Sequence, residues 1–167
     1  MRGRARHGAT LGILALLVVL AAISGWAMLT HPFPKKADAP VCSAASVHAG
    51  EHLYPAQVTV SVLNASRRVG LAGRTLGALT ADGFAAGHSG NATTGTRVDT
   101  AQIWTPEPGS PAVQLVAAWL PGAQIVLKSV TEPGVLVVVG PQFTTVGGGP
   151  SWITATSDAT ICSPTLS

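Results

Sequence analysis

The chain has 167 residues, of which 47% are hydrophobic and only 10% charged, and its formal net charge is +3. Arg2, Arg4 and Arg6 account for this excess, because the other seven basic residues balance the seven acidic ones. A chain without a basic stripe beyond its first residues lacks the electrostatic footprint of a nucleic-acid-binding protein, so we expect no nucleic acid among its partners.

The first predicted element is a membrane anchor over residues 9–29. Ala9 to Leu29 carries no charged side chain, and about 20 apolar residues suffice for a helix to span a bilayer. Because arginines precede this run, residues 1–8 are expected in the cytoplasm and all that follows residue 29 outside the cell membrane. The alternative is a cleaved signal peptide, but its apolar stretch is normally only about 7–15 residues long. We therefore favour an uncleaved single-pass anchor.

Residues 30–56 are predicted to form a juxtamembrane linker and an N-terminal segment, since three prolines within residues 30–40 favour an extended chain. Cys42 and Cys162 are the only two cysteines and bracket the rest of the sequence. In an oxidising compartment such a pair is expected to form a disulfide. The nearby histidines match no zinc-site spacing, so we predict no metal and no other cofactor.

Alternating valines predict a strand around Val58–Leu63, and one apolar face predicts a helix over Leu71–Asp82 that Gly83 ends. A short strand over Phe84–Gly87 and a polar loop over residues 89–97 are expected next. These segments form the first half of the predicted domain.

The second half repeats this order of elements. A strand is predicted over Thr100–Trp104, and a helix begins at Pro111 with Ser110 as its N-cap. A strand follows over Ile125–Val130, and Val135–Val139 is apolar at every position, which indicates a central strand covered on both faces.

The order β-α-β-β-α-β-β predicts an α+β domain over residues 57–143, with two helices packed on one face of a sheet and one transmembrane helix before it. Residues 144–167 are expected to be a C-terminal tail that the disulfide ties back. Four apolar residues near the two cysteines are expected to cover the other face of the sheet: Leu53, Tyr54, Trp152 and Ile153.

The turn between the first strand and the first helix is the candidate binding site, and its residues of interest are Asn64, Ser66, Arg67, Arg68 and Gly70. It leads into a helix N-terminus, which favours anions, but it contains neither glycine-rich phosphate-binding motif. Two interpretations stay open. Asn64 and Ser66 satisfy backbone groups of the turn while Gly70 adopts a conformation that other residues resist, or the two arginines contact an anion such as a sugar phosphate.

The sequence offers no arrangement of catalytic residues. The five histidines are scattered and none lies in a known nucleophile setting, and residues 87–90 do not form a nucleophile elbow. Trp104 and Trp119 are interpreted as core residues, although aromatic rings also stack on sugars. We therefore expect that the protein is not an enzyme.

Five segments occur in a characteristic order: Val58-Thr-Val-Ser-Val-Leu-Asn-Ala-Ser66, Gly70-Leu-Ala72, Gly83-Phe84, Gly90-Asn91 and Val137-Val-Val-Gly-Pro-Gln-Phe143. In this order and spacing they resemble the C-terminal domain of LytR-type proteins, over about Gln57–Phe143. The chain departs from that family by carrying Ala65 where Gly is usual, and by the two arginines in the turn.

In full-length LytR-CpsA-Psr proteins this domain follows a phosphotransferase domain, which this sequence does not contain. An anchor with a lone C-terminal domain resembles the actinobacterial envelope-integrity and virulence-regulator proteins. The resemblance implies a non-catalytic, extracytoplasmic module that supports the cell envelope by binding a cell-wall polymer, a lipid-linked precursor or envelope proteins. A regulatory accessory subunit of a separate wall-glycopolymer transferase is the alternative, and a small independent hydrolase or transferase is a third hypothesis.

Overall fold

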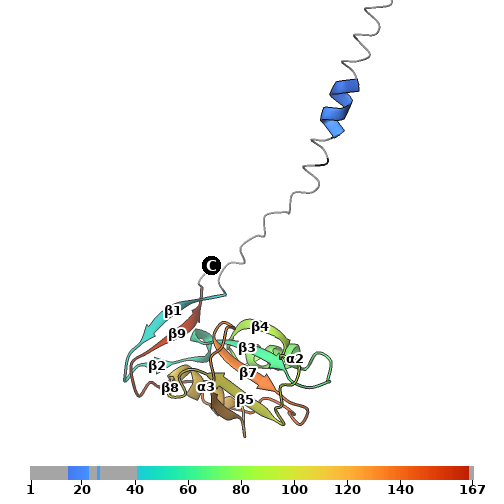
Figure 1. Cartoon of the computed structure of the whole chain (residues 1–167). Helices are drawn as coiled ribbons and strands as arrows, with labels where there is room; N and C mark the ends of the chain where they lie inside the picture. The colour runs from blue at the N-terminus through green and yellow to red at the C-terminus, as the bar shows by residue number, and fades with distance from the viewer. Residues whose placement is uncertain (1–14, 23–25, 27–40, 166–167) are drawn as a thin grey trace, which may run out of the picture. The chain divides into compact units, whose positions relative to one another are not determined.

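The structure, a computed structural model, describes residues 15–22, 26 and 41–165 (Figure 1). The contacts divide the chain into two units, Met1–Asp38 and Ala39–Ser167. In the first unit, residues 15–22 are helical and exposed. None of the described residues belongs to a helix long and apolar enough to cross a membrane. The predicted cytoplasmic segment 1–8, most of the predicted anchor and the first part of the predicted linker lie outside the described residues, so they stay predictions.

The second unit is built on a five-stranded mixed sheet with the strand order β4-β3-β7-β5-β6. These strands are β3 (Thr59–Asn64), β4 (Ala85–Asn91), β5 (Ala101–Thr105), β6 (Gln124–Leu127) and β7 (Val135–Val139). β3 pairs in parallel with β4 and β7, whereas β5 pairs antiparallel with β7 and parallel with β6. β7 lies in the middle and is buried at every position, which confirms the expectation from its continuous apolar sequence.

Two helices, α2 (Leu71–Ala81) and α3 (Pro111–Trp119), cover one face of this sheet. Leu79 of α2 and Leu115 of α3 are fully buried in the same hydrophobic cluster as Val60 and Val137 of the sheet. The predicted arrangement of two helices on one face is therefore present in this α+β domain, and burial of these side chains is its main source of stability.

The expectation that four apolar residues near the cysteines cover the sheet face opposite the helices is wrong. Leu53 and Ile153 pack into the helix-side cluster, while the side chains of Tyr54 and Trp152 are 46% and 43% exposed. The reason is a short ribbon in which β2 (His52–Leu53) pairs with β8 (Ile153–Thr154) beside α3 (Figure 1).

The face opposite the helices has a smaller cluster of its own. Val98, Leu136 and Val138 are buried there, and Trp104 packs against them half-buried. The Nζ atom of Lys128 lies 3.3 Å from the centroid of the Trp104 ring and covers it as a cation–π contact.

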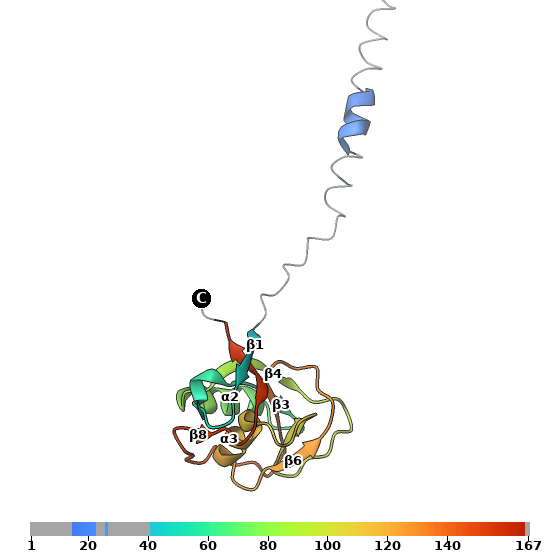
Figure 2. The same cartoon turned by 90° about the vertical axis from the view of Figure 1, so that its left-hand side faces the viewer.

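The ends of the second unit form a ribbon that the sequence analysis did not predict. β1 (Cys42–Val47) pairs antiparallel with β9 (Ala159–Pro164), and the two strands lie side by side in both views (Figures 1 and 2). Cys42 and Cys162 form the predicted disulfide in this ribbon, with their Cα atoms 5.4 Å apart.

The edge strand β4 corrects a second expectation. It continues to Asn91, although a polar loop was expected from residue 89. An edge strand pairs with one neighbour only, and residues 88 and 89 are exposed, so polar side chains there are compatible with a strand. The remaining element is the short 3₁₀ helix η1 (Pro55–Gln57).

Candidate functional site

The predicted turn lies where three strands end. β3, β4 and β7 run in parallel, so their carboxyl ends lie at the same end of the sheet. The residues that follow Asn64, Asn91 and Val139 therefore come together there. The turn, residues 91–96 and Pro141 line a pocket of about 750 Å³ there. Pockets at the carboxyl ends of strands are common ligand sites in α/β sheets, so this end of the sheet is a candidate site.

The Asn64 side chain organises the turn from within. Its Nδ2 donates a hydrogen bond to the Arg68 carbonyl oxygen at 2.8 Å, and its Oδ1 accepts from the N–H and the hydroxyl of Ser66 at 2.8 and 2.7 Å. The Ser66 hydroxyl oxygen in turn accepts from the Arg68 N–H at 3.1 Å. Asn and Ser are favoured in turns for this reason, and the structural interpretation of these two residues is confirmed.

Gly70 closes the turn in the left-handed conformation, with φ +72°, and is the N-cap of α2. A residue with a Cβ atom disfavours this conformation, so the expectation for Gly70 is also confirmed. Its carbonyl oxygen accepts the first helical hydrogen bond, from the Arg74 N–H at 3.0 Å.

The two arginines of the turn have different environments. The Arg68 guanidinium donates from Nη1 to the carbonyl oxygens of Pro141 and Phe143, which ties the turn to the chain that follows β7. The exposed Arg67 side chain has no hydrogen bond or ion pair with any described residue. Arg68 is therefore a structural residue, and Arg67 supplies the available positive charge of the pocket.

The chemistry of this pocket suits an anionic or hydroxylated ligand. None of its lining residues is acidic, and Asn91, Thr93, Thr94 and Thr96 add side chains that both donate and accept hydrogen bonds. The described residues that line it provide groups for binding, and they include neither a general base nor a nucleophile hydrogen-bonded to one.

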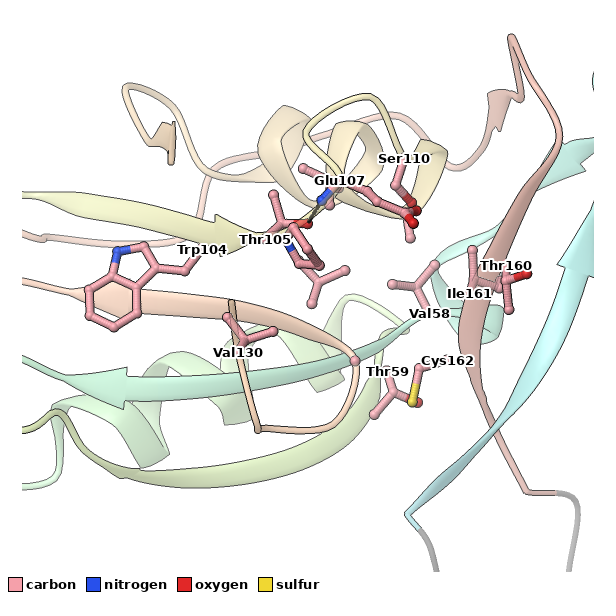
Figure 3. Close-up of a pocket in the computed structure, with 15 residues that line it drawn as sticks. Val58, Thr59, Trp104, Thr105, Glu107, Ser110, Val130, Thr160, Ile161 and Cys162 are labelled. Carbon is pink, nitrogen blue, oxygen red and sulfur yellow. Dashed lines mark hydrogen bonds between the residues drawn. The ribbon is translucent and has the colours of Figure 1, made fainter. Parts of the chain in front are cut away.

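A second pocket, of about 250 Å³, lies at the opposite end of the sheet, where β9 passes the start of β3 and the end of β5 (Figure 3). Glu107, Ser110 and Thr160 are its polar residues near the surface, and the buried Thr59 hydroxyl has no hydrogen-bond partner among the described residues. Ser110 is the N-cap of α3 as predicted, but its side chain forms no capping hydrogen bond. Sequence analysis did not predict this pocket, because one of its walls is the unpredicted strand β9.

Two of the three described histidines, His48 and His88, contact carboxylates. His88 Nδ1 lies 3.1 Å from Glu132 Oε2, and His48 Nδ1 lies 3.7 Å from Asp158 Oδ1. The Ala49 N–H donates to Asp158 and lowers the pKa of that carboxyl below its usual value of 3.8, with His48 adding to the effect. Within the described part of the chain, no three His, Cys, Asp or Glu side chains are grouped to hold a metal ion.

Comparison with known proteins adds a family and a solved structure. Residues 57–143 match the family described as LytR cell envelope-related transcriptional attenuator. The chain is also similar to the crystal structure of the soluble domain of a conserved hypothetical secreted protein from Mycobacterium marinum, with 29% identity and a TM-score of 0.50. That similarity covers 60% of this chain and 78% of the other. No curated protein matches the chain.

Proposed function

The chain belongs to the LytR cell envelope-related family, and we propose that its second unit is a non-catalytic module outside the cytoplasm that binds a component of the cell envelope. Residues 9–29 hold this module at the membrane, and binding supports the integrity of the envelope. The ligand is a cell-wall polymer or a lipid-linked precursor that carries an anionic group.

The location rests on two observations that agree. The similar protein from Mycobacterium marinum is described as secreted, and the Cys42–Cys162 disulfide suits an oxidising compartment. A fusion of alkaline phosphatase after Ser167 should be active, and the full-length protein should remain in the membrane fraction. A shortened, soluble mature form would replace the anchor with a cleaved signal peptide.

The observation that carries the binding role is the guanidinium of Arg67, which pairs with none of the described residues and lies beside a pocket whose lining residues include no acidic one. Asn64 and Arg68 hold this turn in place through hydrogen bonds to the backbone, so the charge is presented on a rigid support. Rigid presentation reduces the entropy lost on binding and thus favours affinity.

The test compares two arginines. Purified Arg67→Ala protein should bind isolated cell-wall material several-fold more weakly than the natural protein, and it should fail to restore detergent and antibiotic resistance in a deletion strain. Arg97→Ala removes the same charge from an exposed residue that lines a different pocket, and it should behave like the natural protein. Equal behaviour of the two variants would move the binding site away from the turn, and turnover of wall precursors by the pure protein would refute the non-catalytic role.

The second candidate function is regulation of a wall-glycopolymer transferase by direct contact. The observation that favours it is Val69, an apolar residue of the same turn that is 90% exposed and therefore accessible to a protein partner. Val69→Ser would then abolish capture of the transferase without changing binding to wall material. Retained capture by this variant would argue against contact through the turn.

A further inference from the structure

Three of the five tryptophan and tyrosine residues of the chain gather around the β2–β8 ribbon and the end of α3. The sequence has four tryptophans and one tyrosine, and Tyr54, Trp119 and Trp152 are the three in question. This aromatic cluster shares no lining residue with the pocket beside Arg67. It is therefore a separate surface that the proposed anion contact does not use.

The register of the ribbon explains why its aromatic side chains point outwards. Leu53 pairs with Ile153, and both side chains pack towards the helix-side core. Successive side chains of a strand point to opposite faces, so the neighbouring residues Tyr54 and Trp152 face away from that core. The His52 ring, one step earlier on the same outward face, contacts the Trp152 ring with 3.9 Å between the ring centroids.

A groove of about 340 Å³ lies beside this face. Tyr54 and Trp119 are the aromatic residues that line it, together with the glycines Gly83 and Gly149. Its lining residues with polar side chains are Tyr54 and the exposed Asp82 and Ser151. The volume falls at the lower end of the range for small-ligand sites, about 300–1,000 Å³.

The walls of the groove are fixed by contacts behind them. The Trp119 Nε1–H donates to the Pro150 carbonyl oxygen at 3.2 Å, and the Phe84 ring meets the Trp119 ring edge-on with centroids 5.9 Å apart. A Cβ atom on Gly149 would lie 2.6 Å from the Trp119 ring, so the backbone of this loop lies flat against the indole. The Tyr54 N–H donates to the Gln57 side chain at 3.0 Å, which holds the backbone on the other side of the groove.

We infer that this groove binds a neutral pyranose unit of an envelope polysaccharide. Aromatic faces carry negative charge density and attract the polarised C–H groups on the apolar side of a sugar ring. The Asp82 carboxylate accepts hydrogen bonds from ring hydroxyls, and Ser151 both accepts and donates them. None of the described lysines and arginines lines the groove, so its lining lacks the positive charge that binds a phosphate or carboxylate group. The inference names a ligand class for the proposed wall-binding function and rests on it.

The test follows the indole N–H signals of the full-length, ¹⁵N-labelled protein in a detergent without a sugar headgroup. Triacetylchitotriose, maltotriose and mannotriose are the neutral probes, glycerol 3-phosphate is the anionic probe, and a proline decamer tests an extended peptide as the occupant. At least one neutral trisaccharide should shift the Trp119 signal, because Trp119 lines the groove. Tyr54→Ala should weaken that binding about tenfold because it removes one wall, and Asp82→Asn should weaken it several-fold.

Leu127→Ala is the matched control, because it removes a side chain that is 72% exposed and lies on the edge strand β6, away from the groove residues. It should bind the trisaccharide like the natural protein. Shifts by none of the three saccharides, unchanged binding by Tyr54→Ala, or shifts by the proline decamer alone would overturn the inference. A third result would separate the two proposals. If Tyr54→Ala abolishes saccharide binding but fully complements the deletion strain, the groove is a saccharide site and the wall-binding function is rejected.

Discussion

Asn64 holds the candidate turn together, and its replacement by alanine tests how far the turn depends on one side chain. Asn64→Ala removes three hydrogen bonds, to the Arg68 carbonyl oxygen and from the N–H and hydroxyl of Ser66. At about 1 kcal/mol net for each bond, the free energy of unfolding should fall by roughly 2–3 kcal/mol. Urea denaturation measures this loss, with an unchanged m-value showing that the folded state keeps its compactness.

Two further variants show whether the hydrogen bonds themselves carry the effect. Ser66→Ala removes two bonds of the same network and should cost roughly 1–2 kcal/mol. Asn64→Asp keeps both acceptor bonds but sets a carboxylate against the Arg68 carbonyl oxygen at a site that is only 7% exposed. Its stability deficit should therefore shrink as the pH falls, because the protonated carboxyl can donate where the amide did. A loss below about 0.5 kcal/mol for Asn64→Ala would refute the reasoning.

The other predictions concern backbone space, the crosslink and pH. Gly134→Ala should lower the free energy of unfolding by roughly 2–4 kcal/mol, because φ is +74° and a Cβ atom would overlap the Thr59 carbonyl. Gly122→Ala, where φ is +78° but the space is open, should lower it by only about 1 kcal/mol. Equal urea midpoints for the two variants would contradict this prediction. The double variant Cys42→Ser, Cys162→Ser should lose up to about 5 kcal/mol of its free energy of unfolding, because the disulfide spans 120 residues. An unchanged melting temperature would exclude a stabilising role for the disulfide. The Ala49 N–H and His48 lower the pKa of Asp158 in the folded state, so the ionised carboxylate stabilises the fold above the unfolded pKa, and this stabilisation is lost as the pH falls through the folded pKa. The difference in melting temperature between the natural protein and Asp158→Asn should therefore shrink below about pH 4. A difference that stays constant with pH would contradict this prediction.

The central elements were predictable because their patterns are local. Alternation predicted the strand β3, although both of its faces are buried, and the continuous apolar sequence of β7 reports burial directly. Ser110-Pro111 marks the start of α3. The ribbon of β1 and β9 has no such signal. Its strands pair across more than a hundred residues, most of their side chains are half-buried or exposed, and only Val47 and Ile161 are buried. Their pairing depends on the rest of the fold and on the disulfide.

Only those features of the candidate site that depend on residues close together in the sequence were predictable. Residue type alone indicates that Asn64, Ser66 and Gly70 shape a turn, but the contact of Arg68 with the Phe143 carbonyl oxygen depends on where the chain leaves β7. Tyr54 and Leu53 were both expected to cover the other face of the sheet because they lie near Cys42, but strand alternation places the two side chains on opposite sides. A two-residue strand is too short for a sequence pattern to reveal this.

The position of the disulfide determines how the second unit would respond to mechanical load. In the antiparallel pair of β1 and β9, the outermost rung joins Cys42 to Pro164, so tension on the chain before Cys42 would unzip the ribbon one rung at a time from that end. The covalent bond from Cys42 to Cys162 lies at this end and blocks the first step. Tension applied through the upstream chain therefore reaches both strands at once and does not peel β1 away from β9.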